Sequence, residues 1–416
     1  MAQKLVPGFK MKVLVVSQYF MPETFIINEL VEEMEKLGHE VAVLTGKPNY
    51  PDGAIFKGYQ VSGVQTEKFG KDIDIYRVPL RPRGRGGAKN LALNYLSFAF
   101  FASVLGPWIL RKRKFDVIFV FAPSPITATI PAIVLKFFKR STLALWVLDL
   151  WPESLVVTKF VKNRIILKAV EVMVRIIYRC CDLILAQSER FIAPIKSLAG
   201  GTEVLYYPNS FKRVANREML ALPDEAEKVL RENFCVVFAG NIGKAQSVET
   251  IVDAAKYLKD IKDLKLVLVG SGSMLSWVQD MKKEHRLDNL ECLGRFDISY
   301  IPTIYAKSKV LMLTLNSDEI LQYTLPWKTQ SYMAAGKPIV GAIDGEGARI
   351  ILESQCGLVG PAENGKTLAE NIRQMHAMAP EKLQAMGTSG FNYFEKNFEM
   401  VAQVKRLLGI FSERTK

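Results

Sequence analysis

The strongest constraint on the fold is an alternation of short apolar runs with stretches of helical periodicity, present in both halves of the chain. The apolar run 12–17 is followed by apolar residues at helical spacing over 25–37 and by a second run at 41–45. Further runs of strand length stand at 73–78, 116–121, 143–148, 182–186 and 204–206. Such continuous runs are typical of parallel strands covered on both faces. The first half therefore predicts a β-α-β start and a doubly wound α/β sheet.

The second half repeats this alternation after a polar, proline-containing stretch at 212–228, where we place a domain boundary. Its apolar runs lie at 234–238, 264–269, 290–293, 310–315 and 339–340, and its helical periodicity at 248–258 and 275–285. A chain of 416 residues exceeds one typical hydrophobic core. We therefore expect two similar sheets that face a cleft.

The chain is basic, and the charge restricts the class of partner. A net charge of +13 predicts an anionic partner: nucleic acid, anionic lipid or a phosphorylated substrate. No Lys- or Arg-rich tail or basic–aromatic pattern is present, so we do not expect nucleic acid. The five cysteines show no metal-ligand spacing, and residues 1–10 lack the apolar region of a signal peptide. A reduced, cytoplasmic protein is the simplest interpretation.

Two features of the first half point to the ligand edge of its sheet. Doubly wound sheets bind ligands at the carboxyl ends of their strands. The loop after the run 12–17 lacks the three-glycine dinucleotide fingerprint, which disfavours NAD. Asp149 and Glu153 directly follow a strand-length run and place two carboxylates at this edge. The long loop 46–59 either contacts a substrate or simply connects, and its length slightly favours contact.

The second half carries a predicted phosphate site. Glycines follow its strands at 240, 243, 270 and 272, where backbone N–H groups can approach a phosphate. A short helix is predicted between Pro326, as its first residue, and Gly336, which ends it. Lys328 and Ser331 share a face near its start, where free N–H groups and the helix dipole favour an anion. An ordinary buried helix–strand joint is the alternative.

One segment is unusually apolar. Residues 91–110 just reach the length of a transmembrane helix, and basic residues flank them. Polar residues and Pro107 interrupt the segment, and strands resume at 116, so a membrane span is disfavoured. We expect a helix in the membrane interface rather than a buried helix, and the basic amphipathic run 159–179 supports this. The expected lipid contacts are Phe98, Phe100, Phe101 and Trp108.

Four motifs link the chain to a known family. They are SQYFMPE at 17–23, DLWPES at 149–154, FAGNIGKAQ at 238–246 and LPWK through GKP at 325–338. Through them the chain from residue 11 onward resembles family 4 retaining glycosyltransferases. It is most similar to the bacterial surface-polysaccharide branch that includes L-fucosamine transferases of O-antigen and capsule synthesis.

The resemblance implies the GT-B fold, which is α/β with two Rossmann-like, doubly wound parallel-sheet domains. The implied organisation is an extension at 1–10, an acceptor-binding domain at 11–210, a nucleotide-sugar-binding domain at 211–397, and a C-terminal helix at 398–416 that packs back on the first domain. Retaining members need no metal, because basic side chains and helix dipoles stabilise the leaving diphosphate. We therefore expect no cofactor and no metal.

The same motifs give the expected site residues. The expected catalytic residues are Asp149, Glu153 and Lys328. The expected nucleotide-sugar contacts are Gly240, Asn241, Gly243, Lys244, Gln246, Gly270, Gln330 and Ser331. Lys328 would hold the diphosphate, and Asp149 or Glu153 would face the sugar or the acceptor hydroxyl, although the leaving phosphate can itself take the acceptor proton. A helix N-cap for Asp149 and a surface salt bridge for Glu153 are the alternatives.

The sequence departs from the common family pattern at four positions. Many members have Arg and Lys in place of Asn241 and Gln246, Glu in place of Ser331, and His in place of Leu148. We expect Lys328 and Lys244 to supply the missing positive charge, and Gln330 or Glu346 to supply the ribose contact.

The predicted function is retaining hexosyl transfer from a UDP-sugar to a lipid-diphosphate-linked saccharide in surface-polysaccharide synthesis. The transferred sugar would be an N-acetylated deoxyhexosamine such as L-FucNAc, and the enzyme would be peripheral or monotopic on the inner face of the cytoplasmic membrane. A UDP-sugar 2-epimerase of GT-B fold and a non-catalytic acceptor-binding subunit are the alternatives. Donor sugar, acceptor, linkage and oligomeric state do not follow from the residues.

Overall fold

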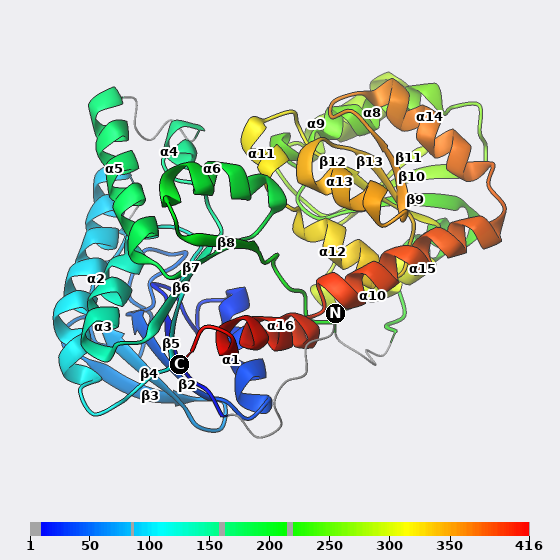
Figure 1. Ribbon diagram of the computed structural model, residues 1–416. Helices are drawn as coiled ribbons and strands as arrows, with labels where there is room; N and C mark the ends of the chain where they lie inside the picture. Colours follow the sequence, from blue (N-terminus) through cyan, green and yellow to red (C-terminus); the bar gives the residue numbers. More distant parts are fainter. Residues whose placement is uncertain (1–9, 85–86, 158–162, 214–218, 416) are drawn as a thin grey trace. The chain divides into compact units, whose positions relative to one another are not determined.

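The computed structural model describes residues 10–84, 87–157, 163–213 and 219–415. It divides the chain into two compact units, 1–212 with 400–416, and 213–399 (Figure 1). The sequence placed these boundaries at 210 and 397. The predicted extension lies outside the described residues except for Lys10, as does the start of the predicted basic run at Lys159.

The first unit is built on an eight-stranded sheet with the order β3-β4-β2-β1-β5-β6-β7-β8. Its strands are β1 Lys12–Val16, β2 Glu40–Gly46, β3 Gln65–Phe69, β4 Ile73–Val78, β5 Val117–Ala122, β6 Thr142–Val147, β7 Leu183–Ala186 and β8 Glu203–Tyr206. All neighbours are parallel except β3, which runs antiparallel to β4 and was not predicted. In the central strands, Val13 pairs with Val41 on one side and with Val117 on the other.

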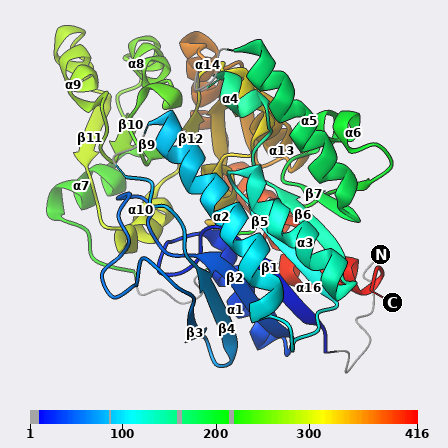
Figure 2. The same ribbon diagram turned by 90° about the vertical axis from the view of Figure 1, so that its left-hand side faces the viewer.

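Helices cover both faces of this sheet (Figures 1 and 2). They are α1 Ile26–Lys36, α2 Ala88–Ile109, η1 Ile126–Thr129, α3 Ile130–Lys139, α4 Glu153–Val157, α5 Arg164–Cys180, α6 Glu189–Ala199 and α16 Met400–Ser412. The helices α2, α3 and α5 lie on one face, and α1 and α16 on the other. Val404, Leu407 and Phe411 of α16 are buried in the core between this sheet and α1, so the end of the chain belongs to the first unit.

The second unit contains a six-stranded parallel sheet with the order β11-β10-β9-β12-β13-β14. Its strands are β9 Phe234–Ala239, β10 Leu264–Val269, β11 Leu290–Gly294, β12 Val310–Thr314, β13 Ile339–Ala342 and β14 Gly357–Gly360. Its helices are α7 Asp224–Glu232, η2 Lys244–Gln246, α8 Val248–Tyr257, α9 Leu275–Glu284, η3 Ile298–Tyr300, α10 Ile301–Lys307, α11 Glu319–Tyr323, α12 Trp327–Ala334, α13 Gly345–Glu353, α14 Gly365–His376 and α15 Pro380–Asn397. The predicted fold class, two doubly wound α/β units, is confirmed.

The strand orders locate the ligand edge of each unit. Strand order reverses between β1 and β5 in the first sheet and between β9 and β12 in the second. Open parallel sheets bind ligands outside the carboxyl ends of the strands at such points. The loops after β1, β5 and β6, and those after β9, β10 and β12, are therefore the places to look for functional side chains.

Candidate active site

Backbone hydrogen bonds join the loops that follow β9, β10 and β11. The N–H of Gly240 donates to the carbonyl of Val269 at 2.8 Å, and the N–H of Gly270 donates to Gly294 at 2.7 Å. A Cβ atom on Gly270 would lie 1.8 Å from the carbonyl oxygen of Gly240, and Gly270 has a φ of +143°. Only glycine allows the two loops to approach this closely.

This packing gives two of the predicted glycines a structural role as well. Gly270 and Gly272 were expected to admit a phosphate, but a Cβ atom on Gly272 would lie 2.3 Å from the carbonyl of Ile242. Their absent side chains are required by loop-to-loop contact. The N–H of Gly240 is also already bonded, so it is not free to bind an anion.

Lys328 lies directly beside Gly240. Helix α12 begins at Trp327, and Pro326 is the residue before it rather than its first residue, as the sequence had suggested. The Nζ atom of Lys328 lies 3.5 Å from the centroid of the Phe238 ring on β9. A Cβ atom on Gly240 would lie 2.7 Å from the Lys328 Cε atom and 3.0 Å from Nζ. The structure thus brings together two predicted site residues from distant parts of the chain.

The ammonium group of Lys328 is buried and unpaired. Its Nζ atom has no hydrogen-bond partner in the described part of the chain, and burial lowers the pKa of Lys328 from 10.5 to about 7. Among the residues that the structure describes, the aromatic face of Phe238 is its one favourable electrostatic contact. A buried amine without a partner is costly to the folded protein. An anion that contacts Nζ would remove this cost.

The other residues of the turn 240–246 are either paired with one another or exposed. The Asn241 side chain donates to the Gln246 side chain at 3.0 Å, so the two residues that stand in place of family cations bind one another. Gly243 packs against both side chains. Lys244 is exposed and begins η2, whose first N–H groups lack partners within the helix. Lys244 can therefore reach a ligand only through a mobile surface side chain.

The residues expected to bind the ribose lie in different surroundings. Gln330 is buried, and the Ser331 hydroxyl is hydrogen-bonded to Tyr305. Glu346 is also buried and forms an ion pair of 2.8 Å with Arg349. The structure gathers none of these three residues at the pocket beside Gly240.

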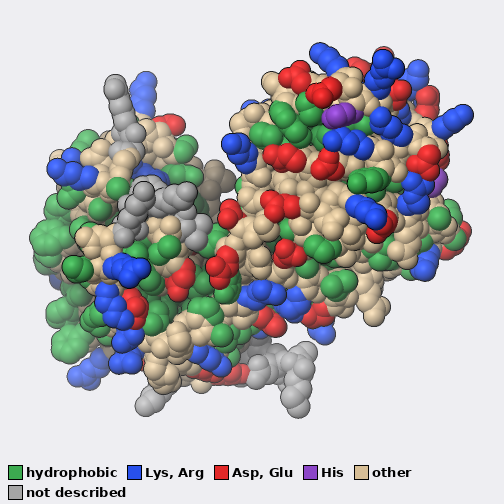
Figure 3. Space-filling view, turned by 90° about the horizontal axis from the view of Figure 1, so that it is seen from above, with side chains coloured by type: hydrophobic (Ala, Val, Ile, Leu, Met, Phe, Trp, Pro, Cys, Tyr) green, Lys and Arg blue, Asp and Glu red, His purple; other side chains and the backbone are tan. Residues whose placement is uncertain are grey.

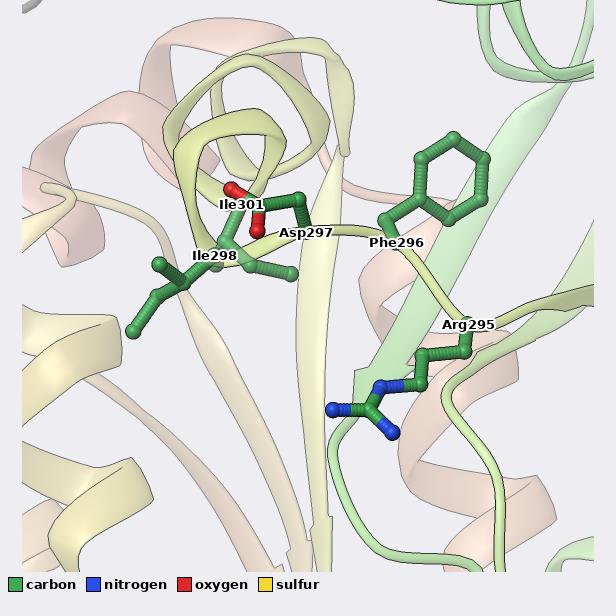
Figure 4. Close-up of a pocket in the computed structure, with 5 residues that line it drawn as sticks. All are labelled: Arg295, Phe296, Asp297, Ile298 and Ile301. Carbon is green, nitrogen blue, oxygen red and sulfur yellow. The ribbon is translucent and has the colours of Figure 1, made fainter.

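That pocket has a volume of about 290 Å³ and lies at the carboxyl ends of β9 and β10. Its lining includes Gly240, Asn241 and Gly270, together with Arg295 and Phe296 from the loop after β11. A second hollow of about 620 Å³ continues from Arg295 to Ile301. In Figure 4 the side chains of Arg295 and Phe296 extend in different directions from this loop.

Neither Arg295 nor Phe296 was expected from the sequence. They could have been found from their position directly after Gly294, the glycine that ends strand β11. In the structure Gly294 has a φ of +76° and lies at the edge of the sheet where ligands bind. The exposed guanidinium of Arg295 places a permanent positive charge at a pocket in which Asn241 and Gln246 supply none.

In the first unit, Asp149 follows β6 and is largely enclosed. Its carboxylate accepts a hydrogen bond from the Ser154 hydroxyl. Burial raises the pKa of Asp149, the side chains of Ser154, Trp151 and Ser124 oppose this rise, and Glu153 adds to it. Asp149 is thus not the N-cap of α4, which begins at Glu153. A half-buried carboxylate of raised pKa at a ligand edge is a candidate acid or base.

The surroundings of Asp149 contain one exposed carboxylate and several hydroxyl groups. Glu153 is exposed at the start of α4. Two side chains that the sequence had not singled out, Tyr95 of α2 and Ser124 after β5, lie at the same edge, and Tyr95 is hydrogen-bonded to Ser124 and to Tyr19. The hydroxyls of Ser154 and Ser124 are hydrogen-bonded to the Asp149 carboxylate and that of Tyr95 lies next to them, a set suited to binding a polyhydroxylated molecule.

The loop 46–59 has no regular structure beyond Gly46, the last residue of β2, and its first residues are fixed. Glu23 is buried, and its carboxylate accepts hydrogen bonds from the backbone N–H groups of Asn49 and Tyr50, both at 2.8 Å. The Tyr50 ring packs against Tyr19 at a centroid distance of 5.7 Å. The predicted approach of this loop to a substrate stays a prediction, but its start lies beside Tyr19 at the ligand edge.

Within the described residues, no group of three or more His, Cys, Asp and Glu side chains is arranged to hold a metal ion. The prediction that transfer needs no metal and no cofactor stays a prediction. A metal ion can be bound by the diphosphate of the substrate together with fewer than three protein side chains.

The chain is similar to known glycosyltransferases. Residues 224–392 match the family model described as glycosyl transferases group 1. The chain is 23% identical over 377 residues to the probable glycosyltransferase WbjE of Pseudomonas aeruginosa, which covers 85% of this chain and 90% of that protein. It is 24% identical to the putative colanic acid biosynthesis glycosyl transferase WcaI of Escherichia coli K12, over 78% of this chain and 82% of that protein.

Among solved structures, HepE of Anabaena in complex with UDP aligns with 97% of this chain and 100% of its own, with a TM-score of 0.65 and 13% sequence identity. At this identity, the likeness shows a shared fold.

Proposed function

We propose that this chain, a glycosyltransferase of GT-B fold, transfers a sugar from a UDP-sugar to a lipid-diphosphate-linked saccharide in the synthesis of a surface polysaccharide. We propose an N-acetylated deoxyhexosamine such as L-FucNAc as the transferred sugar, because the chain shares its motifs with the branch that includes L-fucosamine transferases. The name of WcaI, a relative linked to colanic acid, supports a polysaccharide product. The relatives described above are named as glycosyltransferases, and the transfer assay below separates the 2-epimerase alternative from the proposed function.

The observation that carries the donor half is the unpaired ammonium of Lys328 beside Gly240. A diphosphate at the start of α12 would accept hydrogen bonds from Nζ and would lie at the positive end of the helix dipole. Such preorganised donors stabilise the charge that develops on a leaving diphosphate. Arg295 would add a second cation, and Phe296 would offer an apolar face to the nucleoside.

The acceptor half is assigned to the first unit. Asp149, with the hydroxyls of Ser124, Tyr95 and Tyr19 nearby, would bind the acceptor saccharide. The carboxylate of Asp149 could accept the proton of the attacking hydroxyl, or it could position that hydroxyl while the leaving phosphate takes the proton. Glu153 is exposed, and we assign it a contact with the acceptor rather than a proton transfer.

A lipid-linked acceptor requires contact with a membrane, and one face of the first unit fits this requirement. Exposed apolar side chains of α2, α3 and α5, here termed the three-helix surface, are Leu96, Phe100, Val104, Trp108, Phe137, Phe138, Ile165, Ile166, Val172 and Ile176. Hydrophobic side chains gather at the corresponding edge in Figure 3. The guanidinium of Arg111 lies over the Trp108 ring at 4.6 Å. Apolar side chains bordered by basic ones are typical of interfacial membrane binding.

Helix α2 is the one described helix long and apolar enough to cross a membrane, and 28% of its apolar window is buried. The strands that precede and follow it, β4 and β5, belong to one sheet. A span would separate them, so we propose peripheral attachment through the exposed side of α2. Of the expected lipid contacts, Phe98 is wrong, because it is fully buried in the first unit.

The proposed function is tested by titration of the protein with UDP, followed by a transfer assay with UDP-sugars and a polyprenyl-diphosphate-linked saccharide in detergent. We expect UDP to raise the melting temperature of the wild-type protein more than that of Lys328→Met. Loss of transfer in Asp149→Asn with unchanged UDP binding would support the assignment of the acceptor to the first unit and of the donor to the second. Absence of any UDP effect on the wild-type protein would overturn the proposed donor, and conversion of the UDP-sugar without an acceptor would overturn transfer.

A further inference from the structure

A large cavity lies at the edge of the first sheet opposite Asp149. Its volume is about 840 Å³, and residues that precede or begin strands β5 to β8 line it, together with the last turns of α3 and α5. The lining lies entirely within the first unit, including Arg414 from the end of the chain. The cavity is at the amino ends of the strands, so neither the proposed donor site nor the proposed acceptor site uses it.

Two of the cations in this cavity are neutralised by carboxylates. Lys136 forms an ion pair with Asp182 at 2.7 Å, and Arg414 forms an ion pair with Glu203 at 2.9 Å. These pairs hold the last turn of α3 and the end of the chain against the sheet. A third carboxylate, Asp116, also lines the cavity and accepts a hydrogen bond from the backbone N–H of Lys12 at 2.7 Å, so the four cations of the lining outnumber its three carboxylates by one.

The other two cations are Arg140 and Arg179, and their guanidinium groups are exposed. Across the residues with described positions, neither guanidinium has a carboxylate partner. Arg140 ends α3 in a left-handed conformation with a φ of +54°, and the Arg179 side chain passes over Gly200. A guanidinium group binds a phosphate through two parallel hydrogen bonds. Two unpaired guanidinium groups in one cavity therefore favour a phosphate-bearing ligand.

The cavity borders the three-helix surface. Phe137 lines the cavity, and its side chain is 81% exposed, next to the exposed Phe138. A ligand that fills the cavity and also covers Phe137 must carry an anionic head and an apolar body. A free phosphate would leave the aromatic border in water, whereas a phospholipid matches both parts of the surface.

We propose that this cavity binds the phosphate-bearing headgroup of one anionic phospholipid, with its acyl chains along the three-helix surface. Arg140 and Arg179 contact the phosphate, and Phe137 contacts the first methylene groups. This inference rests on the membrane attachment proposed above and adds a stoichiometric lipid site to it. Such a site anchors the enzyme at a fixed orientation, which a purely apolar surface does not define.

The test is a calorimetric titration with dihexanoyl-phosphatidylglycerol below its micellar concentration, because monomeric lipid has no membrane surface potential. The variant is Arg140→Gln with Arg179→Gln, which retains the side-chain stems. The matched control is Lys112→Gln with Lys114→Gln, which removes the same charge from exposed residues outside the cavity lining. Thermal unfolding of each variant checks the fold, and the single Arg140→Gln variant replaces the double one if the latter is unfolded.

We expect the wild-type protein to bind one lipid, the arginine variant to bind at least about tenfold more weakly, and the lysine variant to bind within about twofold of the wild type. Equal losses in both variants would show attraction by overall charge and overturn the site. Binding of glycerol phosphate as tightly as the lipid would show a phosphate site and overturn the lipid assignment. Absence of saturable binding to the wild-type protein would overturn the proposal as a whole.

The proposed enzymatic function is measured separately. Transfer in detergent should be unchanged in the arginine variant, since the cavity lies away from Asp149 and from the second unit. If transfer fails in the wild-type protein while the lipid binds, the proposed function is wrong and the lipid site stands. If transfer proceeds and the lipid does not bind, the reverse holds.

Discussion

Replacement of Lys328 by methionine tests the donor site most directly, because methionine keeps the apolar stem and removes the ammonium group. In the ligand-free protein, burial lowers the pKa of Lys328 to about 7. Above that pH the free protein must take up a proton before it presents a cation to UDP. The protonated fraction falls from about one half at pH 7 to about one hundredth at pH 9, so the association constant for UDP should fall about 50-fold.

The same group predicts a change in the free energy of unfolding. The pKa of Lys328 is lower in the folded protein than in the unfolded chain, so between about pH 7 and pH 10.5 the unfolded chain binds more protons. Stability from this group therefore rises with pH in that window. The buried amine costs about 4 kcal/mol at pH 7 and about 2 kcal/mol at pH 9. Without ligand, Lys328→Met should be more stable than the wild type by these amounts.

Both effects are measurable on one set of proteins. Calorimetric titration with UDP at several pH values gives the affinity, and repetition in buffers of different ionisation enthalpy counts the proton taken up. The terminal phosphate of UDP is already ionised above about pH 6 and does not contribute. Burial raises the pKa of Tyr305 to about 12, so this tyrosine, which packs against Tyr332 of α12, does not titrate in the window.

The exposed Lys244 supplies the control. Lys244→Met should weaken UDP binding only slightly and keep the pH dependence. Persistence of the 50-fold fall in Lys328→Met would show that another group titrates, and a pH-independent affinity in the wild type would show that Lys328 does not contact the diphosphate. Either result would refute the reasoning.

Four further substitutions have defined outcomes. Gly270→Ala should lower the free energy of unfolding by more than about 3 kcal/mol in urea titrations, since its Cβ atom would overlap the Gly240 carbonyl, whereas Gly201→Ala, with open space around it, should change little. Asp149→Asn should reduce transfer at least about 100-fold without loss of UDP affinity. In the pH–rate profile of the wild type, the pH at which the rate falls on the acidic side should lie above the usual pKa range of Asp, because burial raises the pKa of Asp149. Arg295→Ala should weaken UDP binding by about 1.5–3 kcal/mol in calorimetry; an unchanged affinity would exclude a direct contact. Phe100→Ser with Trp108→Ser should release the protein from anionic vesicles in sedimentation assays without lowering its melting temperature, and undiminished binding would remove the role of α2.

Much of the fold follows from the sequence, because each central strand is covered on both faces and reads as a continuous apolar run. Strand β10 (Leu264–Val269) stands where such a run predicts it, and β4 (Ile73–Val78) was also located, although Asp74 and Arg77 interrupt its apolar residues. The edge strand β3 (Gln65–Phe69) lacks such a run, since its side chains alternate between partly buried and exposed positions. Its antiparallel pairing with β4 is a tertiary contact that cannot be predicted from a local sequence pattern.

The candidate site was less predictable. Lys328 could be identified because a helix start and a lysine are local features, but its burial against Phe238 depends on a contact between α12 and β9. Arg295 escaped detection because a single arginine in a loop has no periodic signal. The glycines at 270 and 272 could be located from the sequence, but the backbone atoms that exclude a side chain there come from another loop and leave no local signal.

The sequence by itself determined the two doubly wound units, the strand ends that carry Asp149 and the glycine-containing turn 240–246, and the apolar character of α2 with its basic flanks. Only the tertiary structure decided which face of α2 meets solvent, which cations remain unpaired, and which residues share a pocket. The reason is physical: periodicity and propensity act along the chain over a few residues, whereas burial, pairing and the pKa of Lys328 are set by atoms that are distant in sequence.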